Sequence, residues 1–212
     1  HLTKEIEPRD FIIQTPVSSG TVKARAMQVR ENHVDTKEKI VTLTCGDGQV
    51  QLDPASDISK IAVFERHKGT GNKAFGFVTG TGFSVPVAMA TTVAHDSHNL
   101  MVIGNDDNLM AKAANRVVSM QGGIAVVTES ESTELPLPVA GLMSNAPFEE
   151  VAEQSRAISN ALKEAGCTMN YAFMTLSLLA LIVVPELRLS DKGLIKTSDK
   201  GFKQVPLFLD PN

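Results

Sequence analysis

Alternating apolar and polar positions in the first quarter of the chain predict short β-strands. The segments with this pattern are residues 11–13, 21–29 and 39–43. Asp47 and Gly48 form a pair that predicts a tight hairpin turn, because both residue types adopt positive φ readily. Pro54 lies in an acidic stretch, and this combination favours a turn over a strand. The pattern therefore predicts a small β module over residues 1–57.

Beyond residue 57 the apolar segments have the length and β-branched content of buried strands. The predicted strands are residues 59–65, 74–79, 87–93, 100–103, 124–127 and 135–137. Five glycines crowd residues 69–82, which predicts chain reversals or close backbone approach. The prolines of segment 135–144 favour an extended edge connection into the helix that follows.

Two segments have the apolar period of a helix that lies on a sheet. The first is capped by Asn105 or Asp106 and ends at Gly122, and the second begins at Pro147 and ends at Gly166. The predicted buried positions are Leu109, Met110, Ala113, Ala114, Val117 and Val118 in the first helix, and Val151, Ser155, Ile158, Leu162 and Ala165 in the second.

The order of these elements predicts an α+β fold. We expect a small β-sandwich-like module, residues 1–57, followed by a layered α/β domain, residues 58–212. Its sheet is expected to be mixed or mainly antiparallel, with at least two packed helices. The longest apolar run, residues 173–185, is shorter than the roughly 20 residues of a membrane-spanning helix, which indicates buried core.

Composition narrows the function classes. The 212 residues carry 20 Lys and Arg against 24 Asp and Glu, a formal net charge of −4, so neither a nucleic-acid nor a membrane partner is expected. Cys45 and Cys167 are too far apart for a CxxC pair, which favours a reducing, cytoplasmic compartment. The N-terminal residues show no export signal and have the character of the inside of a longer chain.

The densest polar cluster is the segment 91–99, which lies between two apolar strands and contains two of the five histidines. Imidazoles beside a carboxylate can bind a metal, move protons near neutral pH or hydrogen-bond a purine edge. In an extended segment His95 and Ser97 point one way, while Asp96 and His98 point the other. Only a bent loop would bring all four side chains together. The alternative is a scaffold loop whose polar groups satisfy each other.

A second polar cluster covers residues 65–72, where Arg66, His67 and Lys68 precede two glycines. Positive charge beside glycine suggests anion capture by backbone N–H groups. The segment matches no nucleotide-phosphate loop, however, and a solvated hairpin with surface charges is favoured.

Four segments together resemble one family. They are residues 57–67 (DISKIAVFERH) with Gly69-Thr70-Gly71, residues 92–99 (TVAHDSHN), residues 135–144 (LPLPVAGLMS), and residues 174–181 (MTLSLLAL) with Pro185-Glu186-Leu187. In this order they are similar to the C-terminal part of bacterial adenine deaminases. Residues 1–57 are similar to the end of the small β-sandwich that accompanies amidohydrolase barrels.

The resemblance implies hydrolysis of adenine to hypoxanthine and ammonia in purine salvage. In that family a barrel holds a divalent metal, manganese or iron, through histidines that include an H-x-H motif. This chain has no such motif, so we expect it to contain no metal ligands of its own, to need the upstream amidohydrolase barrel as partner, and to be inactive alone.

The candidate site residues follow from the two polar clusters and the resemblance. The catalytic candidates are His95, Asp96 and His98, and the candidates for binding adenine are Ser97, Asn99, Arg66 and His67. A homo-oligomer is expected. Two alternatives remain: a non-catalytic oligomerisation or lid module, supported by the apolar run, and a small metal-binding domain that uses the 95–98 loop.

Overall fold

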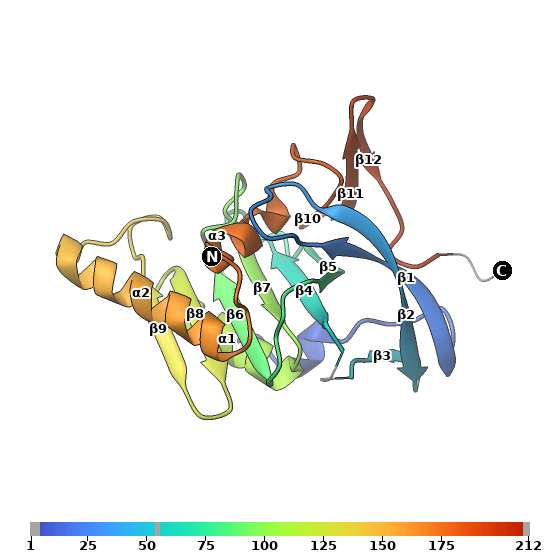
Figure 1. Cartoon of the computed structure of the whole chain (residues 1–212), viewed down its shortest axis with the longest axis horizontal. Helices are drawn as coiled ribbons and strands as arrows, with labels where there is room; N and C mark the ends of the chain where they lie inside the picture. Colours follow the sequence, from blue (N-terminus) through green and yellow to red (C-terminus); the bar gives the residue numbers. More distant parts are fainter. Residues whose placement is uncertain (1–4, 54–55, 210–212) are drawn as a thin grey trace.

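One nine-stranded sheet forms the centre of the protein (Figure 1). The computed structural model describes residues 5–53 and 56–209. The sheet has the order β3-β2-β1-β5-β4-β7-β6-β8-β9, and every neighbouring pair is antiparallel except β1 and β5. The strands are β1 (Gly20–Gln28), β2 (Lys37–Gly46), β3 (Gln49–Gln51), β4 (Ile58–Phe64), β5 (Lys73–Thr79), β6 (Val87–Thr91), β7 (Leu100–Gly104), β8 (Gly123–Thr128) and β9 (Ser132–Pro136).

The α+β class and the mixed sheet are confirmed, but the predicted order of modules was wrong. Strand β1 pairs with β5 in parallel, with Ala26 opposite Phe77 and Gln28 opposite Thr79. The strands before residue 57 are therefore part of the same sheet as the strands after it. The alternation of apolar and polar residues identifies a strand, but it does not show with which distant strand that strand pairs. The division into residues 1–57 and 58–212 stays a prediction, and Pro54 lies outside the described residues.

Helices cover both faces of this sheet. One face packs against α1 (Asp107–Ser119) and the short 3₁₀ helix η1 (Pro8–Phe11). The other packs against α2 (Phe148–Glu164), α3 (Ala172–Ser177) and the 3₁₀ helix η2 (Leu178–Ala180). The central strands are buried on both sides, since every residue of β6 and β7 is buried.

The first helix follows its prediction closely, except that Val118 is only half-buried. The Asp106 carboxylate caps it by accepting the Leu109 N–H at 2.9 Å. At its other end Gln121 takes a left-handed conformation, φ 62°, before Gly122. Lys60 anchors the helix start from the sheet, since its ammonium lies 2.8 Å from both carboxylate oxygens of Asp107.

The second helix begins directly after Pro147, as predicted, and buries Ile158 and Leu162. Ala165, at its C-terminal cap, is also buried. Val151 is only partly buried, and Ser155, which was also expected to be buried, is exposed. A serine in the period of an apolar stripe can lie at the edge of the stripe at little cost, because its hydroxyl then remains in water.

The N-terminal segment 11–13 does not form the predicted strand. Residues Pro8–Phe11 form a 3₁₀ helix, in which the Asp10 carboxylate accepts the Glu7 N–H at 3.0 Å. Phe11 is fully buried, with its ring 5.5 Å from that of Phe64. Proline at the first helical position and this capping contact favour a helical turn over an extended segment.

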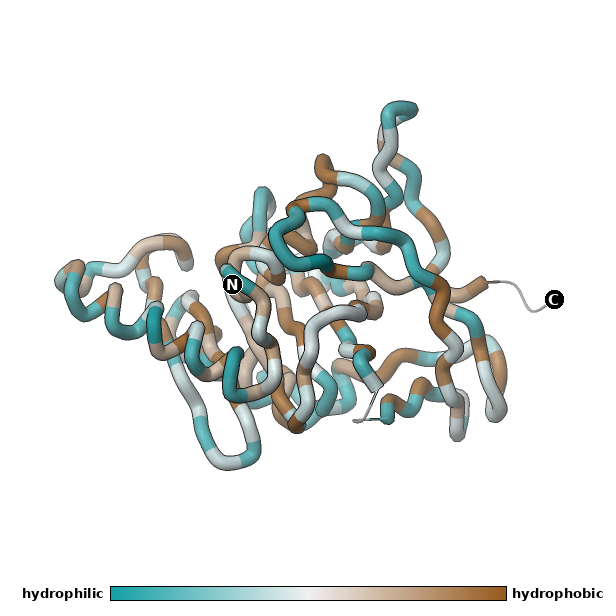
Figure 2. The backbone as a smooth tube through the Cα atoms, in the orientation of Figure 1, coloured by the Kyte–Doolittle hydropathy of each residue, from teal (hydrophilic) through white to brown (hydrophobic). Residues whose placement is uncertain are grey.

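A second, three-stranded antiparallel sheet near the C-terminus was not predicted. It consists of β10 (Leu187–Ser190), β11 (Gly193–Ser198) and β12 (Gly201–Gln204). The turn between β11 and β12 is hydrophilic in Figure 2 and projects from the molecule. Arg188 joins this sheet to the segment after β1, donating hydrogen bonds to the carbonyl oxygens of Val184 and Val34. Its burial lowers the pKa of the Arg188 guanidinium to about 10.

The apolar run 173–185 is buried in part, because α3 and η2 contribute Leu176 and Leu179 to the core while Met174 and Val183 remain exposed. No helix in the described ranges has the length and apolar character needed to cross a membrane.

Candidate functional site

Three loops meet at one edge of the nine-stranded sheet. They are residues 65–72 after β4, residues 92–99 between β6 and β7, and residues 137–147 after β9. The strand register brings them together, because Phe64 pairs with Leu100 and Thr91 with Met101 at the same edge. In Figure 1 this is the upper edge of the sheet. Loops at a sheet edge carry side chains on a rigid support, which suits a functional site.

The 92–99 segment is bent, which is the condition under which its histidines can come together. The His98 N–H donates to the Ala94 carbonyl oxygen at 2.8 Å, and His98 has a left-handed φ of 51°. The rings of His95 and His98 lie edge to face, with centroids 5.3 Å apart. The bend therefore pairs the two histidines, while Asp96 and Ser97 are exposed.

Neither histidine is satisfied by its described surroundings. The Nδ1 atoms of His95 and His98 are buried and have no hydrogen-bond partner within the described part of the chain. Burial lowers the pKa of His98, and the neighbouring His95 and Arg66 lower it further. His98 is therefore neutral at pH 7, with one ring nitrogen to donate and one to accept. These two nitrogens keep an unused hydrogen-bonding capacity at the edge of the sheet, as a candidate binding site would.

Arg66 connects its own loop to the other two. Its Nε donates to the His98 carbonyl oxygen at 2.5 Å, and its Nη2 donates to the Ala140 carbonyl oxygen at 2.9 Å. The guanidinium lies against Gly141, where a Cβ would be 2.8 Å from Nη2. Burial lowers the pKa of Arg66. In this arrangement Arg66 positions the histidine loop.

His67 and Asn99 also hold the loops in place. The His67 Nε2 lies 2.7 Å from the Ser97 carbonyl oxygen. The Asn99 side chain is buried, and its Oδ1 accepts the Arg66 N–H at 3.4 Å. The two polar clusters predicted from the sequence therefore form one site, in which these side chains connect the loops.

Glu65 is a residue that the sequence did not single out. Its carboxylate accepts the backbone N–H groups of Thr70, Lys68 and His67. These bonds, with that of Thr70 first, lower the pKa of Glu65 to about 2. The sequence pattern that could have identified Glu65 is a Glu at the end of a predicted strand, followed within a few residues by Gly and Thr. A carboxylate at such a position can accept the backbone N–H groups of a tight turn.

The site does not fit a metal ion. Over residues 5–53 and 56–209, no three His, Cys, Asp or Glu side chains are grouped as metal ligands would be. The alternative of a small metal-binding domain built on His95, Asp96 and His98 is therefore not supported.

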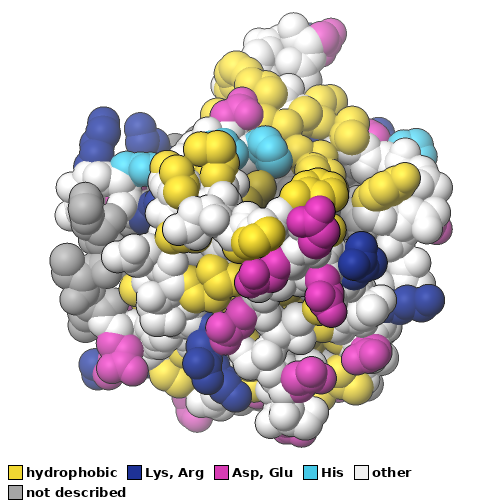
Figure 3. Space-filling view, turned by 90° about the vertical axis from the view of Figure 1, so that its left-hand side faces the viewer, with side chains coloured by type: hydrophobic (Ala, Val, Ile, Leu, Met, Phe, Trp, Pro, Cys, Tyr) yellow, Lys and Arg dark blue, Asp and Glu magenta, His cyan; other side chains and the backbone are white. Residues whose placement is uncertain are grey.

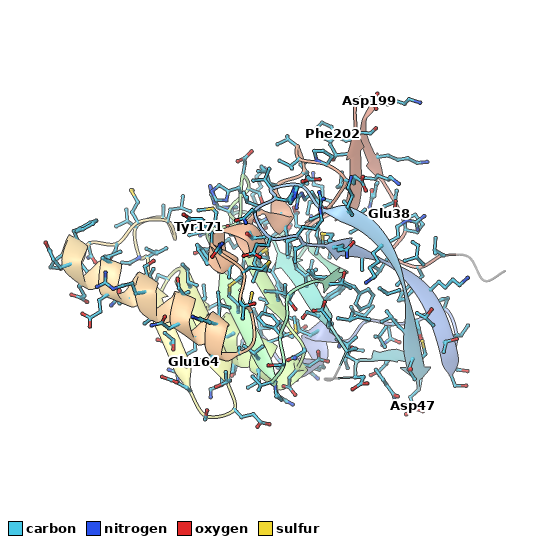
Figure 4. The ribbon with its side chains drawn as sticks, viewed as in Figure 1. Glu38, Asp47, Glu164, Tyr171, Asp199 and Phe202 are labelled. Atoms are coloured by element: carbon cyan, nitrogen blue, oxygen red, sulfur yellow. The ribbon has the colours of Figure 1, made fainter. Side chains whose placement is uncertain are left out.

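Large apolar side chains are exposed on the loop after β9 and on the elements that follow it. On the face seen in Figure 3, hydrophobic side chains gather in the upper half, with histidines between them and acidic groups below. Tyr171, labelled in Figure 4, starts α3 and is 83% exposed. We use the name apolar patch for five exposed side chains of the loop after β9, the start of α2 and the start of α3: Val139, Met143, Phe148, Tyr171 and Met174.

Comparison with known proteins gives consistent matches over most of the chain. The family model for the adenine deaminase C-terminal domain matches residues 33–200. A protein of Rubrobacter xylanophilus named adenine deaminase is 54% identical over 200 residues, which cover 94% of this chain and 33% of the relative. Those of Moorella thermoacetica and Roseobacter denitrificans are 44% and 42% identical, over 98% and 100% of this chain. The chain spans about a third of the length of these relatives.

Proposed function

Because the chain belongs to the family of adenine deaminase C-terminal domains, we propose that it acts as the C-terminal third of an adenine deaminase. The reaction is the hydrolysis of adenine, with water, to hypoxanthine and ammonia in purine salvage. The observation that carries this proposal is the similarity to adenine deaminases over almost the whole chain. The cytoplasm, a reducing compartment, suits the two buried free cysteines, Cys45 and Cys167.

In this proposal the chain is inactive alone. The divalent metal, manganese or iron, is held by residues of the upstream amidohydrolase barrel, since the described residues offer no ligand set. The test is an ammonia-release assay of the purified 212-residue chain with adenine and added manganese or iron, beside a full-length relative. We expect no turnover from the chain, and turnover comparable to that of the full-length enzyme would contradict the proposal.

We further propose that the 95–99 loop faces the adenine pocket of the complete enzyme. The support is the pair of buried Nδ1 atoms of His95 and His98 that have no described partner. A neutral imidazole both donates and accepts a hydrogen bond, as the nitrogen-rich edge of a purine does. The exposure of Asp96 and Ser97 on the same loop supports a contact of these residues with substrate or the barrel, whereas Arg66, His67 and Asn99 hold the loop.

Substitution of the two histidines in the full-length enzyme tests this role. We expect His95→Ala and His98→Ala to lower kcat/KM by tens-fold or more, which is the scale of a lost acid–base or binding contact. His33→Ala is the matched control, because His33 is exposed on another loop, where its Nδ1 lies 3.3 Å from an Asp35 carboxylate oxygen. A change in thermal stability without a change in kcat/KM would make the loop a scaffold.

The apolar patch is proposed to pack against the upstream barrel. The support is that five large apolar side chains are exposed on the loop after β9, the start of α2 and the start of α3, since exposed apolar surface is typical of an interface. The patch also favours a second candidate function, a module for oligomerisation or for a lid. Sedimentation of the chain separates these functions. A monomer is expected if the barrel covers the patch, and a dimer abolished by Phe148→Ser and Tyr171→Ser would favour self-association.

A further inference from the structure

Thr92 begins the histidine loop, residues 92–99, at a point where three segments of the chain meet. The residue is 3% exposed and follows the last residue of β6 directly. Its backbone N–H donates to the Gly123 carbonyl oxygen at 3.0 Å. This bond continues the β6–β8 pairing one residue beyond Thr91 and Ile124, which are opposite each other. The backbone of Thr92 is therefore fixed to the sheet.

The hydroxyl of Thr92 makes a further connection, to the loop after β9. It accepts the Gly123 N–H at 2.9 Å and donates to the Gly141 carbonyl oxygen at 2.7 Å. A hydroxyl has one proton to donate, and the Gly123 carbonyl oxygen is more distant, at 3.4 Å. The proton therefore joins the start of the histidine loop to a residue 49 positions later in the chain.

The junction around this hydroxyl is closely packed. Gly122, Gly123 and Gly141 all have positive φ. A Cβ on Gly122 would lie 2.3 Å from the Gly141 Cα and 3.2 Å from the Thr92 hydroxyl oxygen. The backbones approach this closely because glycine has no side chain. A small change in the Thr92 side chain must therefore move one loop against the other.

Two side chains hold consecutive carbonyl groups in the loop after β9. Arg66 donates to the Ala140 carbonyl oxygen at 2.9 Å, and Thr92 donates to that of Gly141. Arg66 also donates to the His98 carbonyl oxygen, at the other end of the histidine loop. The histidine loop is thus connected at both ends to the same turn, at its start by Thr92 and at its end through Arg66.

We propose that Thr92 is a positioning residue for the hydrolysis of adenine. Its hydroxyl fixes the start of the histidine loop against Gly141 and so sets the place of His95 and His98 at the adenine pocket. The hydroxyl is engaged within the fold, so it acts through the two histidines and does not contact adenine. The proposal rests on the function proposed above for this loop.

The test compares kcat/KM of three variants of the full-length enzyme. Thr92→Val keeps the shape of the side chain but has no hydroxyl, and we expect it to lower kcat/KM by about tenfold, the scale of a misplaced catalytic group. Thr92→Ser keeps the hydroxyl and should stay within about twofold of the unsubstituted enzyme. Thr36→Val is the matched control, because the Thr36 hydroxyl is also buried and bonded to backbone, at Leu187.

The control separates positioning from stability. Both valine variants lose a buried hydroxyl, so both should unfold more easily, but only Thr92→Val should lower kcat/KM. Equal losses of kcat/KM in the two variants, or no loss in Thr92→Val, would overturn the proposal. His98→Ala distinguishes the cause of a failure. If it lowers kcat/KM and Thr92→Val does not, only the role of Thr92 fails, and if neither does, the function proposed for the loop fails as well.

A spectroscopic measurement tests the same role without deaminase activity. In NMR spectra of the 212-residue chain, Thr92→Val should shift the ring resonances of His95 and His98 and leave those of His33 unchanged, since His33 is exposed on another loop. Thr92→Ser should restore the positions of the shifted resonances. Unchanged His95 and His98 resonances in Thr92→Val would contradict the proposal, because the loop would then keep its place without the hydroxyl.

Discussion

The Nε of Arg66 donates a hydrogen bond to the backbone carbonyl oxygen of His98, 32 positions later in the chain and 2.5 Å away. The same guanidinium reaches the Ala140 carbonyl oxygen on a third loop. One side chain therefore connects the two polar clusters that the sequence shows separately. The position of His95 and His98 depends on this contact, although Arg66 itself lies on a different strand end.

Replacing Arg66 should loosen the histidine loop. We expect Arg66→Ala to lower the free energy of unfolding by about 2 kcal/mol, because hydrogen bonds from a charged donor to two carbonyls are lost. Arg66→Lys should recover only part of this, since a single ammonium cannot replace the fork of a guanidinium. Urea denaturation of the chain measures both. Lys68→Ala, at an exposed neighbour, is the control and should have no effect beyond about 0.5 kcal/mol.

The same variant has a spectroscopic consequence. Arg66 is one of the charges that lower the pKa of His98, together with His95. Arg66→Ala should therefore raise the pKa of His98 towards its ordinary value without restoring it fully, because burial remains the larger cause. Titration of the histidine resonances by NMR checks this shift. An unchanged His98 resonance throughout would mean that Arg66 does not hold the loop.

The ion pair of Lys60 and Asp107 should respond asymmetrically to substitution. The Lys60 side chain is 7% exposed and that of Asp107 is 29% exposed. Asp107→Asn leaves a buried ammonium without its counter-charge and should cost about 3 kcal/mol. Lys60→Met leaves a carboxylate that water reaches, and it should cost less, about 1 kcal/mol.

The loss of stability expected for the buried Lys60–Asp107 pair can be compared with that of a more exposed ion pair. Arg116 and Glu134 lie 3.4 Å apart with side chains 51% and 30% exposed, so Glu134→Gln should cost less than 1 kcal/mol. Chemical denaturation of Asp107→Asn, Lys60→Met and Glu134→Gln measures the loss in free energy of unfolding for each variant and so ranks them. If Asp107→Asn and Glu134→Gln lowered the free energy of unfolding equally, the burial of Lys60 would not explain the cost of losing its partner.

Glu65 should make stability depend on pH. Its pKa is lowered from 4.5 to about 2 in the folded chain, chiefly by the Thr70 N–H, so the folded state favours the charged form. The contribution of Glu65 is therefore present above about pH 4.5 and is lost as the pH falls towards 2. Glu65→Gln should flatten this part of the stability profile. Melting temperatures between pH 6 and pH 2 measure it, and identical profiles for the two proteins would exclude this role.

Gly122 should not tolerate a side chain. Its φ is +123°, and a Cβ there would lie 2.3 Å from the Gly141 Cα. Gly122→Ala should cost about 3 kcal/mol, because both loops must shift in addition to the backbone strain. Gly201→Ala is the matched control, since Gly201 has a φ of +105° but no atom within 4 Å of a built Cβ. It should cost only about 1 kcal/mol of backbone strain, as measured by thermal unfolding.

The features that the sequence predicted correctly depend on residues close together in the chain. The start of α1 was predicted from a cap at Asn105 or Asp106, of which Asp106 is the cap, and from the apolar period behind it. The tight turn was predicted from Asp47 and Gly48, both of which have positive φ. The 3₁₀ helix at Pro8–Phe11 was missed because a short apolar run does not distinguish an extended segment from a turn. Four segments in fixed order were enough for the family, which the match over residues 33–200 confirms.

The amino-acid order by itself determined the class of fold, most of the strands and two of the helices, because the hydrophobic period and capping act over a few residues. Only the tertiary structure decided that β1 lies beside β5 and that the last strands form a second sheet. It also decided that Arg66, His98 and Ala140 meet at one edge. Such contacts join segments far apart in the chain, and burial of the whole core, rather than any local preference, selects among the possible pairings.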